Sequence, residues 1–150
     1  MNRYLLYLNA KRCIGCQGCE IHCKAYKSLP PGPKLCEISH TPLKSVRGVG
    51  RTVFAFRSCY HCEDPFCVAV CPTGAMIKRA DGIVHIDQEK CIGCMACAGA
   101  CPWNIPQLNP ATAKAVKCDY CLDRLEAGLK PACVTKCMAR ALKFVTLQEI

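Results

Sequence analysis

One stretch of this chain decides its fold: CIGCMACAGACP, residues 91–102. Its first three cysteines recur at every third residue, and a fourth follows four residues later, directly before a proline. The same C-x2-C-x2-C-x3-C spacing occurs at residues 13–23, where Ile and Gly again separate the first two cysteines. Such internal similarity indicates a duplicated module.

Two more groups of four cysteines vary this spacing, with a middle gap of four residues in one and eleven in the other. We number the four groups as quartets in chain order. Their members are Cys13, Cys16, Cys19 and Cys23 (quartet one); Cys59, Cys62, Cys67 and Cys71 (quartet two); Cys91, Cys94, Cys97 and Cys101 (quartet three); and Cys118, Cys121, Cys133 and Cys137 (quartet four). Only Cys36 lies outside them.

The cysteine density allows two general explanations, disulfides or metal. Seventeen of the 150 residues are Cys, which is a density typical of small secreted disulfide scaffolds. However, the count is odd, and no secretory signal precedes Cys13. Cysteines three residues apart also suit ligands that converge on one point. The sequence therefore predicts metal binding.

The spacing also distinguishes between metals. Structural zinc is typically held by two separated pairs of Cys or His, which quartets two and four resemble when each is taken alone. Quartets one and three, with three evenly spaced cysteines, fit zinc poorly. Their spacing is the one that holds [4Fe-4S] clusters in bacterial ferredoxins. We predict four [4Fe-4S] clusters, and a zinc-stabilised interaction module is the alternative from another class.

In two-cluster ferredoxins, the fourth cysteine of each run binds the other cluster. Quartets two and three both end in Cys-Pro and are joined by a predicted hairpin around Asp81-Gly82, so we expect them to exchange ligands. By elimination, quartets one and four form the other pair. The predicted ligands are Cys13, Cys16, Cys19 and Cys137 (cluster 1); Cys118, Cys121, Cys133 and Cys23 (cluster 2); Cys59, Cys62, Cys67 and Cys101 (cluster 3); and Cys91, Cys94, Cys97 and Cys71 (cluster 4).

This pairing predicts an α+β fold in which one ferredoxin-like 2[4Fe-4S] module is nested inside another. The chain, residues 1–150, would be a single compact unit, with residues 1–51 plus 107–150 as the outer module and 52–106 as the inner one. Local patterns predict the elements between quartets. These are strands at 3–9, 52–56 and 141–147, a helix at 18–29, a connector at 35–49, a hairpin at 75–79 and 83–87, a loop at 106–113 and a helical turn or two within 122–132.

Charge and hydropathy limit the class of partner. The formal charge is +9, but four clusters with their thiolates contribute about −8, so the loaded protein would be nearly neutral. Basicity therefore gives no support to nucleic-acid binding. No apolar run is long enough to cross a bilayer, so we expect no direct membrane insertion and a cytoplasmic location. No G-x-G-x-x-G fingerprint predicts a nucleotide site.

Beyond the quartets, several longer stretches are distinctive: 59–67 (CYHCEDPFC), 71–75 (CPTGA), 117–125 (KCDYCLDRL) and 131–134 (PACV). With these, residues 12–144 resemble the four-cluster iron–sulfur subunits of the dimethyl sulfoxide reductase type, which also accompany formate dehydrogenases. Similar small subunits accompany tungsten aldehyde oxidoreductases. The family usually has Cys-Pro at the end of quartet four, where this chain has Cys137-Met138.

The resemblance implies the same nested pairing and an electron-transfer subunit without a substrate site of its own. It implies a catalytic molybdenum or tungsten oxidoreductase subunit as one partner and a second redox subunit as the other. Because many members continue beyond the last strand, we also expect a compact unit that docks on a soluble partner or end to end with copies of itself. A ferredoxin-like carrier, or a subunit of a hydrogenase or carbon monoxide dehydrogenase, is the alternative.

A few residues outside the ligand sets invite specific expectations. We expect Cys36 to be a buried free thiol, and Ile14 and Ile92 to cover clusters against water. Packing or hydrogen bonding is expected of His61 and His22, cluster shielding of Trp103, and counter-charge near the thiolates of Lys24, Lys117 and Arg124.

Overall fold

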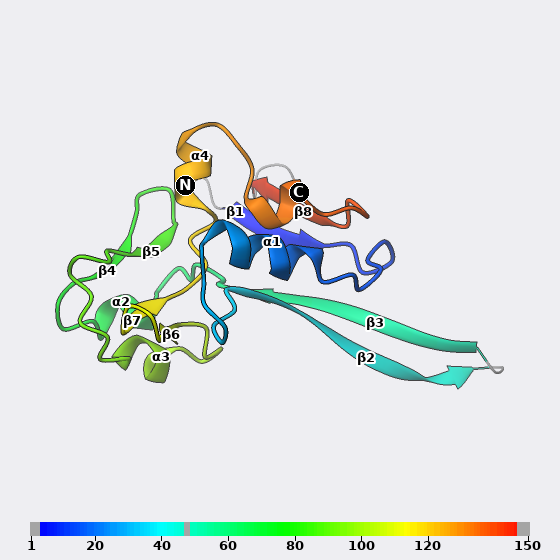
Figure 1. Cartoon of the computed structure of the whole chain (residues 1–150), viewed down its shortest axis with the longest axis horizontal. Helices are drawn as coiled ribbons and strands as arrows, with labels where there is room; N and C mark the ends of the chain where they lie inside the picture. Colours follow the sequence, from blue (N-terminus) through cyan, green and yellow to red (C-terminus); the bar gives the residue numbers. More distant parts are fainter. Residues whose placement is uncertain (1–3, 47–48, 147–150) are drawn as a thin grey trace.

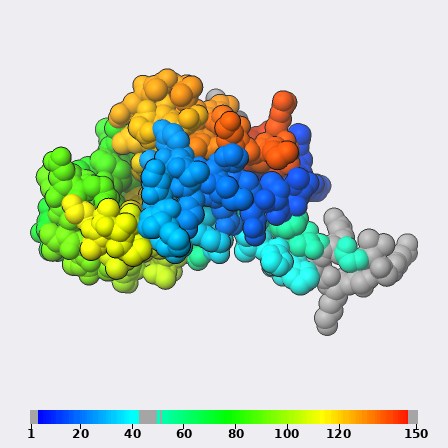
Figure 2. All heavy atoms as spheres, in the orientation of Figure 1, coloured from blue at the N-terminus to red at the C-terminus, as the bar shows by residue number. Residues whose placement is uncertain are grey.

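The computed structural model describes residues 4–46 and 49–146, with the backbone alone described at 43–46, 49 and 51. Within these ranges the strands form four separate two-stranded sheets, and the helices are short. The prediction of an α+β fold of short elements is confirmed. In Figure 2, residues between quartets two and three (green) lie at one end of the body, beside the segments of quartets one and four (blue and orange).

The two ends of the chain meet in one sheet (Figure 1). Strand β1 (Tyr4–Leu8) pairs antiparallel with β8 (Leu142–Thr146) over five residue pairs, from Tyr4↔Thr146 to Leu8↔Leu142. Beside this sheet, helix α1 (Gly18–Tyr26) packs against α5 (Ala132–Thr135). The strands predicted at 3–9 and 141–147 are confirmed, and quartets one and four are brought side by side.

A second group of elements lies between these ends in the chain. Helix α2 (Phe66–Ala69) packs against α3 (Ala96–Ala100), and strand β4 (Met76–Lys78) pairs with β5 (Val84–Ile86). The turn between the strands is closed by a hydrogen bond from the Gly82 N–H to the Arg79 carbonyl, 3.0 Å long. The predicted hairpin around Asp81-Gly82 is confirmed.

The prediction of a connector at 35–49 was wrong. Strand β2 (Cys36–Val46) pairs antiparallel with β3 (Val49–Ser58) to form a long hairpin that projects from the body (Figure 1), and the strand predicted at 52–56 lies within β3. Pro42 resembles a strand breaker, but in a two-stranded sheet every strand is an edge strand, where proline is tolerated. Gly48, another expected breaker, lies outside the described residues.

Two other expectations also needed correction. The loop at 106–113 contains strand β6 (Gln107–Asn109), which pairs with β7 (Lys114–Val116) across a tight turn. Unlike β4 and β5, these strands do not flank an Asp-Gly pair that would mark a hairpin turn. The helical turns predicted within 122–132 are confirmed as α4 (Leu122–Glu126), and a further helix, α5, begins at Ala132 with Pro131 as its N-cap.

The buried core consists largely of cysteine. Its larger cluster combines Cys19, Cys23, Cys36, Cys118 and Cys133 with apolar residues from both ends and the middle of the chain: Leu35, Ile38, Ile83, Tyr120 and Leu142. A smaller cluster surrounds Cys97 and includes Met76, Val84 and Ala115. The interior is therefore arranged around sulfur, as expected if the quartets hold clusters.

Candidate cluster sites

All 17 cysteines lie in the described part of the chain, and each is a free thiol. In the same part, no three His, Cys, Asp or Glu side chains are gathered as ligands of a single metal ion. The four quartets differ in which cysteines lie near one another.

Quartet three encloses a small cavity together with one cysteine from quartet two. The cavity is lined by the three evenly spaced cysteines of quartet three and by Cys71, and Ile92 closes part of it. Burial raises the pKa of Cys97, and the neighbouring Cys91 and Cys94 raise it further. The backbone N–H of Ala115 donates a hydrogen bond to Cys91 Sγ over 3.4 Å. The predicted ligands of cluster 4 are thus brought together around one space.

The cysteines of quartet two lie near the last cysteine of quartet three. Burial raises the pKa of Cys67 to about 11, and the three cysteines Cys59, Cys101 and Cys62 all contribute to the increase, against a lowering effect of Lys117. Cys101 belongs to quartet three in sequence. The predicted ligands of cluster 3 therefore also lie near one another. Soft sulfur donors in groups of four suit iron–sulfur clusters.

Quartet one reaches toward the end of the chain. Burial raises the pKa of Cys19 to about 11, and Cys137 of quartet four contributes to the increase. A Cβ atom added at Gly18 would lie 3.5 Å from Cys16 Sγ and 3.9 Å from the carbonyl oxygen of Lys136. The first turn of α1 is therefore in contact with the segment that leads into Cys137. Three of the predicted ligands of cluster 1 are linked in this way, with Cys13 completing the set in sequence.

Quartet four is the most deeply buried. Burial raises the pKa of Cys133, and Cys23 and Cys121 are the next contributors. Burial likewise raises the pKa of Cys118, with further contributions from Cys133, Cys59 and Cys23. The predicted ligands of cluster 2 thus lie together, and one of them also lies near Cys59 of cluster 3.

The unassigned cysteine lies against this site. Cys36 is 3% exposed, and its Sγ donates a hydrogen bond to the Cys19 carbonyl over 3.6 Å. A hydrogen bond with Cys36 lowers the pKa of Cys23 more than burial raises it. The expectation that Cys36 is a buried free thiol is confirmed. Its hydrogen bond favours the ionised form of the neighbouring Cys23 thiol.

The basic residues are placed differently from one another. Lys117 donates to Cys59 Sγ over 3.4 Å, which confirms counter-charge for this residue. Lys24 donates to the Pro33 carbonyl and Arg124 to the Lys130 carbonyl, and counter-charge at a thiolate stays a prediction for both.

Sequence reasoning missed Lys27, whose charge opposes the increase that burial causes in the pKa of Cys121. Its Nζ lies 2.8 Å from a carboxylate oxygen of Asp119. The available signal was its position four residues after Cys23, which is one helical turn further along α1.

Two further expectations concern His61 and Trp103. His61 is 4% exposed, and its Nδ1 accepts a hydrogen bond from the Val84 N–H over 2.9 Å, as predicted for a hydrogen-bonding residue. Burial and, to a smaller extent, the charge of Lys117 together lower the pKa of His61 to about 2, so the ring is neutral. Trp103 is 51% exposed and lies against Tyr60, and its role in shielding a cluster stays a prediction.

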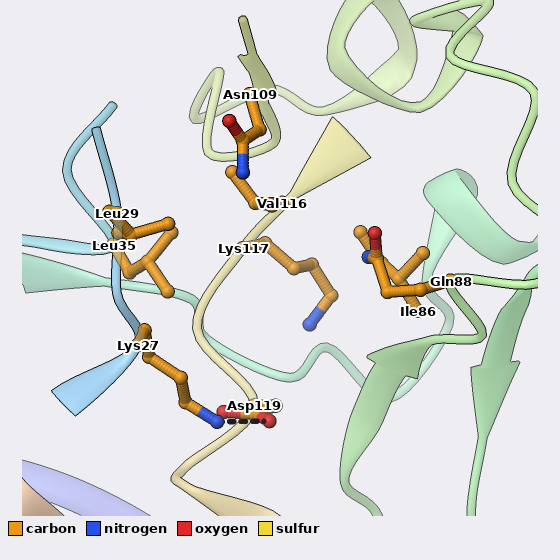
Figure 3. Close-up of a pocket in the computed structure, with 9 residues that line it drawn as sticks. All are labelled: Lys27, Leu29, Leu35, Ile86, Gln88, Asn109, Val116, Lys117 and Asp119. Atoms are coloured by element: carbon orange, nitrogen blue, oxygen red, sulfur yellow. Dashed lines mark hydrogen bonds and ion pairs between the residues drawn. The ribbon is translucent and has the colours of Figure 1, made fainter. Parts of the chain in front are cut away.

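A pocket lies where the two groups of elements meet (Figure 3). Lys117 crosses it, with Leu29 and Leu35 on one side and Ile86 and Gln88 on the other. Leu29 and Leu35 follow α1, whereas Ile86 ends β5 and Gln88 follows it. The Lys117 side chain therefore spans the junction between the two groups of elements.

Comparison with known proteins identifies the family. A model of the 4Fe-4S dicluster domain matches residues 51–147, which is more than half of the chain. This protein belongs to that family. The prediction of [4Fe-4S] clusters in an iron–sulfur electron-transfer subunit is confirmed.

Several relatives match nearly all of the chain. The thiosulfate reductase electron transfer subunit of Salmonella typhi is 43% identical over 150 residues, which cover 99% of this chain and 78% of the relative. One of the chains of the anaerobic dimethyl sulfoxide reductase of Escherichia coli is 43% identical over 155 residues, covering 99% and 76%. A tetrathionate reductase subunit of Salmonella typhimurium is 40% identical, covering 93% and 56%. Over the part of the chain that the structure describes, no helix could span a membrane.

Proposed function

We propose that this chain carries four [4Fe-4S] clusters in two nested pairs and conducts electrons between a catalytic subunit and a second redox partner. The observation that carries the proposal is the reciprocal exchange between quartets two and three. Cys71 lines the cavity of quartet three, and Cys101 of quartet three lies near Cys67 of quartet two. Such exchange is the arrangement of two-cluster ferredoxins.

The outer pair is supported by independent contacts. Cys137 lies near Cys19, and Cys23 lies near Cys133, so quartets one and four exchange their last cysteines in the same way. The pairing of β1 with β8 joins the two ends of this outer module. Residues 1–51 with 107–150 then form one module, and residues 52–106 form the module nested within it.

The order of the clusters follows from burial. Cys16 of cluster 1 and Cys94 of cluster 4 are the two exposed cysteines among the predicted ligands. Beside them Ile14 and Ile92 expose 65% and 64% of their side chains. Clusters 2 and 3 meet at the buried junction, where Cys118 lies near Cys59. We therefore propose that electrons enter and leave at clusters 1 and 4.

The residues of the chain determine how well electrons pass. Each cluster, once bound, takes up and releases one electron, and this is the chemistry that it supplies. The cysteines fix the positions of the clusters, backbone amides such as that of Ala115 donate to their sulfurs, and Ile14 and Ile92 keep water from their outer sides. Hydrogen bonds and burial of this kind set the potentials.

The catalytic partner we propose is a molybdenum- or tungsten-pterin oxidoreductase subunit. The relatives named as subunits of thiosulfate, dimethyl sulfoxide and tetrathionate reductases favour a reductase of oxidised sulfur compounds over a formate or aldehyde oxidoreductase. The second redox subunit is the other expected partner.

The test is anaerobic co-expression with a candidate catalytic subunit of this class. A stable complex with about sixteen iron atoms per copy of this chain is expected, because each cubane holds four. Cys97→Ser should lower the iron content, while Cys36→Ala, which removes the one cysteine outside the quartets, is the matched control. A colourless, iron-free protein that binds zinc would contradict the proposal, as would a free chain that is fully active as a diffusible carrier.

A further inference from the structure

Lys117 is an unusual residue in this molecule because its ammonium is buried. The residue is 6% exposed and lies between β7 and Cys118. Its Nζ donates hydrogen bonds to Cys59 Sγ over 3.4 Å, to the Cys118 carbonyl over 2.9 Å and to the Val84 carbonyl. An ammonium has three donors, and all three partners are acceptors. The site is therefore built for the charged form of the side chain.

The charges around Lys117 leave one candidate counter-ion. In the part of the chain that the structure describes, its ammonium forms no ion pair with a carboxylate, whereas Lys27 at the same pocket pairs with Asp119 at 2.8 Å. His61, which also faces the junction, is neutral. A buried charge is costly unless it is paired. Among the three partners of Lys117, only the Cys59 sulfur becomes negative, as a thiolate ligand.

The contacts also join the two modules. Cys59 and Val84 belong to the inner module, and Lys117 and Cys118 belong to the outer one. Val84 further holds His61, whose ring packs on Tyr120 with centroids 3.8 Å apart. The ammonium is thus fixed from both sides, between a ligand of cluster 3 and the backbone of a ligand of cluster 2.

We propose that Lys117 raises the midpoint potential of cluster 3 and so controls the electron transfer between clusters 3 and 2. The proposal rests on the proposed function. Reduction adds one negative charge to a cluster, and a fixed positive charge beside its ligand stabilises the reduced form. One electron moves between two clusters in this step, and no bond forms or breaks.

The test is a redox titration of the anaerobic native complex, followed by electron paramagnetic resonance. In Lys117→Met, the reduced-to-oxidised ratio of one cluster at a fixed potential should fall at least tenfold, which is about 59 mV for a one-electron couple. Lys117→Arg, which keeps the charge, should shift less. Lys114→Met is the matched control, because Lys114 begins β7, the strand that ends just before Lys117, and donates to the Gln88 carbonyl. Unchanged potentials in a fully iron-loaded Lys117→Met complex would overturn the proposal.

A second measurement needs no variant and applies if Lys117→Met does not retain its clusters. The wild-type complex is prepared with lysine labelled by nitrogen-15 at the side chain, and the reduced protein is studied by electron–nuclear double resonance. A nitrogen-15 coupling to one cluster is expected, and its absence would overturn the proposal. An iron-free wild-type complex would instead contradict the proposed function, so the two failures are distinguishable.

Discussion

The loops at residues 13–16 and 91–94 have the same sequence, Cys-Ile-Gly-Cys, and nearly the same local structure. The glycines have φ of +68° and +70°, and the isoleucines are 65% and 64% exposed. They differ in what lies behind the glycine. A Cβ atom at Gly15 would collide with the ring of Phe54, whereas one at Gly93 would collide with the carbonyl oxygen of Ala113.

The conformation of each loop is set locally, whereas the packing behind it is set by a distant segment. The conformation of the loop belongs to the cysteine spacing and to a glycine with positive φ, so it recurs in both places. Behind Gly15 the packing is supplied by β3, and behind Gly93 it is supplied by the β6–β7 turn. Duplicated cluster loops are therefore supported by unrelated segments, and this predicts that equivalent substitutions have unequal effects.

The largest effects are expected where the two loops are alike. Cys19→Ser and Cys97→Ser each remove a buried ligand, and each should reduce the iron content by about four atoms per chain. Loss of either cluster should also interrupt electron transfer through the complex and lower stability, since metal binding contributes to folding. Iron analysis of the anaerobic complexes checks this, and an undiminished iron content in either variant would contradict it.

Gly93→Ala is expected to be the more harmful of the two glycine substitutions. The new methyl group would collide with backbone, which cannot move aside without displacing the β6–β7 turn, and alanine also disfavours positive φ. We expect a loss of about 3 kcal/mol, or a decrease in Tm of about 10 °C for a chain of this size. Thermal unfolding of the anaerobic protein measures it, and a Tm within about 2 °C of wild type would contradict this expectation.

Gly15→Ala should cost less, about 1.5 kcal/mol, because an aromatic side chain can rotate away from the new methyl group. Phe54→Leu should recover part of that loss in the Gly15→Ala background and none in the Gly93→Ala background. This difference is a non-additivity measurable as two double-mutant cycles. Equal behaviour of the two cycles would show that the loops are not supported separately.

Cys36→Ala should have the smallest effect. It removes a buried thiol and its hydrogen bond to the Cys19 carbonyl, for an expected cost of about 1 kcal/mol. The iron content should not change, because Cys36 is not a ligand. The pKa of Cys23 should rise when the hydrogen bond with Cys36 is lost, which thiol titration of the protein before cluster loading measures. An iron content reduced by a whole cluster would make Cys36 a ligand and would contradict the account.

Sequence predicted the parts of this molecule that depend on spacing. The quartets, the strands near both ends and the hairpin around Asp81-Gly82 could be recognised because each is encoded within at most 20 consecutive residues. The hairpin of β2 and β3 was missed because Pro42 and the glycines resemble loop residues when the paired strand is not considered.

The features that depend on distant segments could not be derived. Nothing in the sequence indicates that Phe54 lies behind Gly15 or that Ala113 lies behind Gly93. Lys117 was predicted to be a counter-charge, but its partner Cys59 is 58 residues away, and its burial at the junction depends on how the modules pack. Pairwise contacts of this kind are decided by tertiary structure.

The most direct test of the central claim, ligand exchange between quartets, is an experimental structure of the anaerobic native complex with its clusters bound. The account predicts four cubanes, with Cys71 bound to the cluster of quartet three and Cys101 to that of quartet two, and with Cys23 and Cys137 exchanged in the same way. Four cubanes in which each quartet binds its own cluster, or single metal ions in place of cubanes, would contradict it.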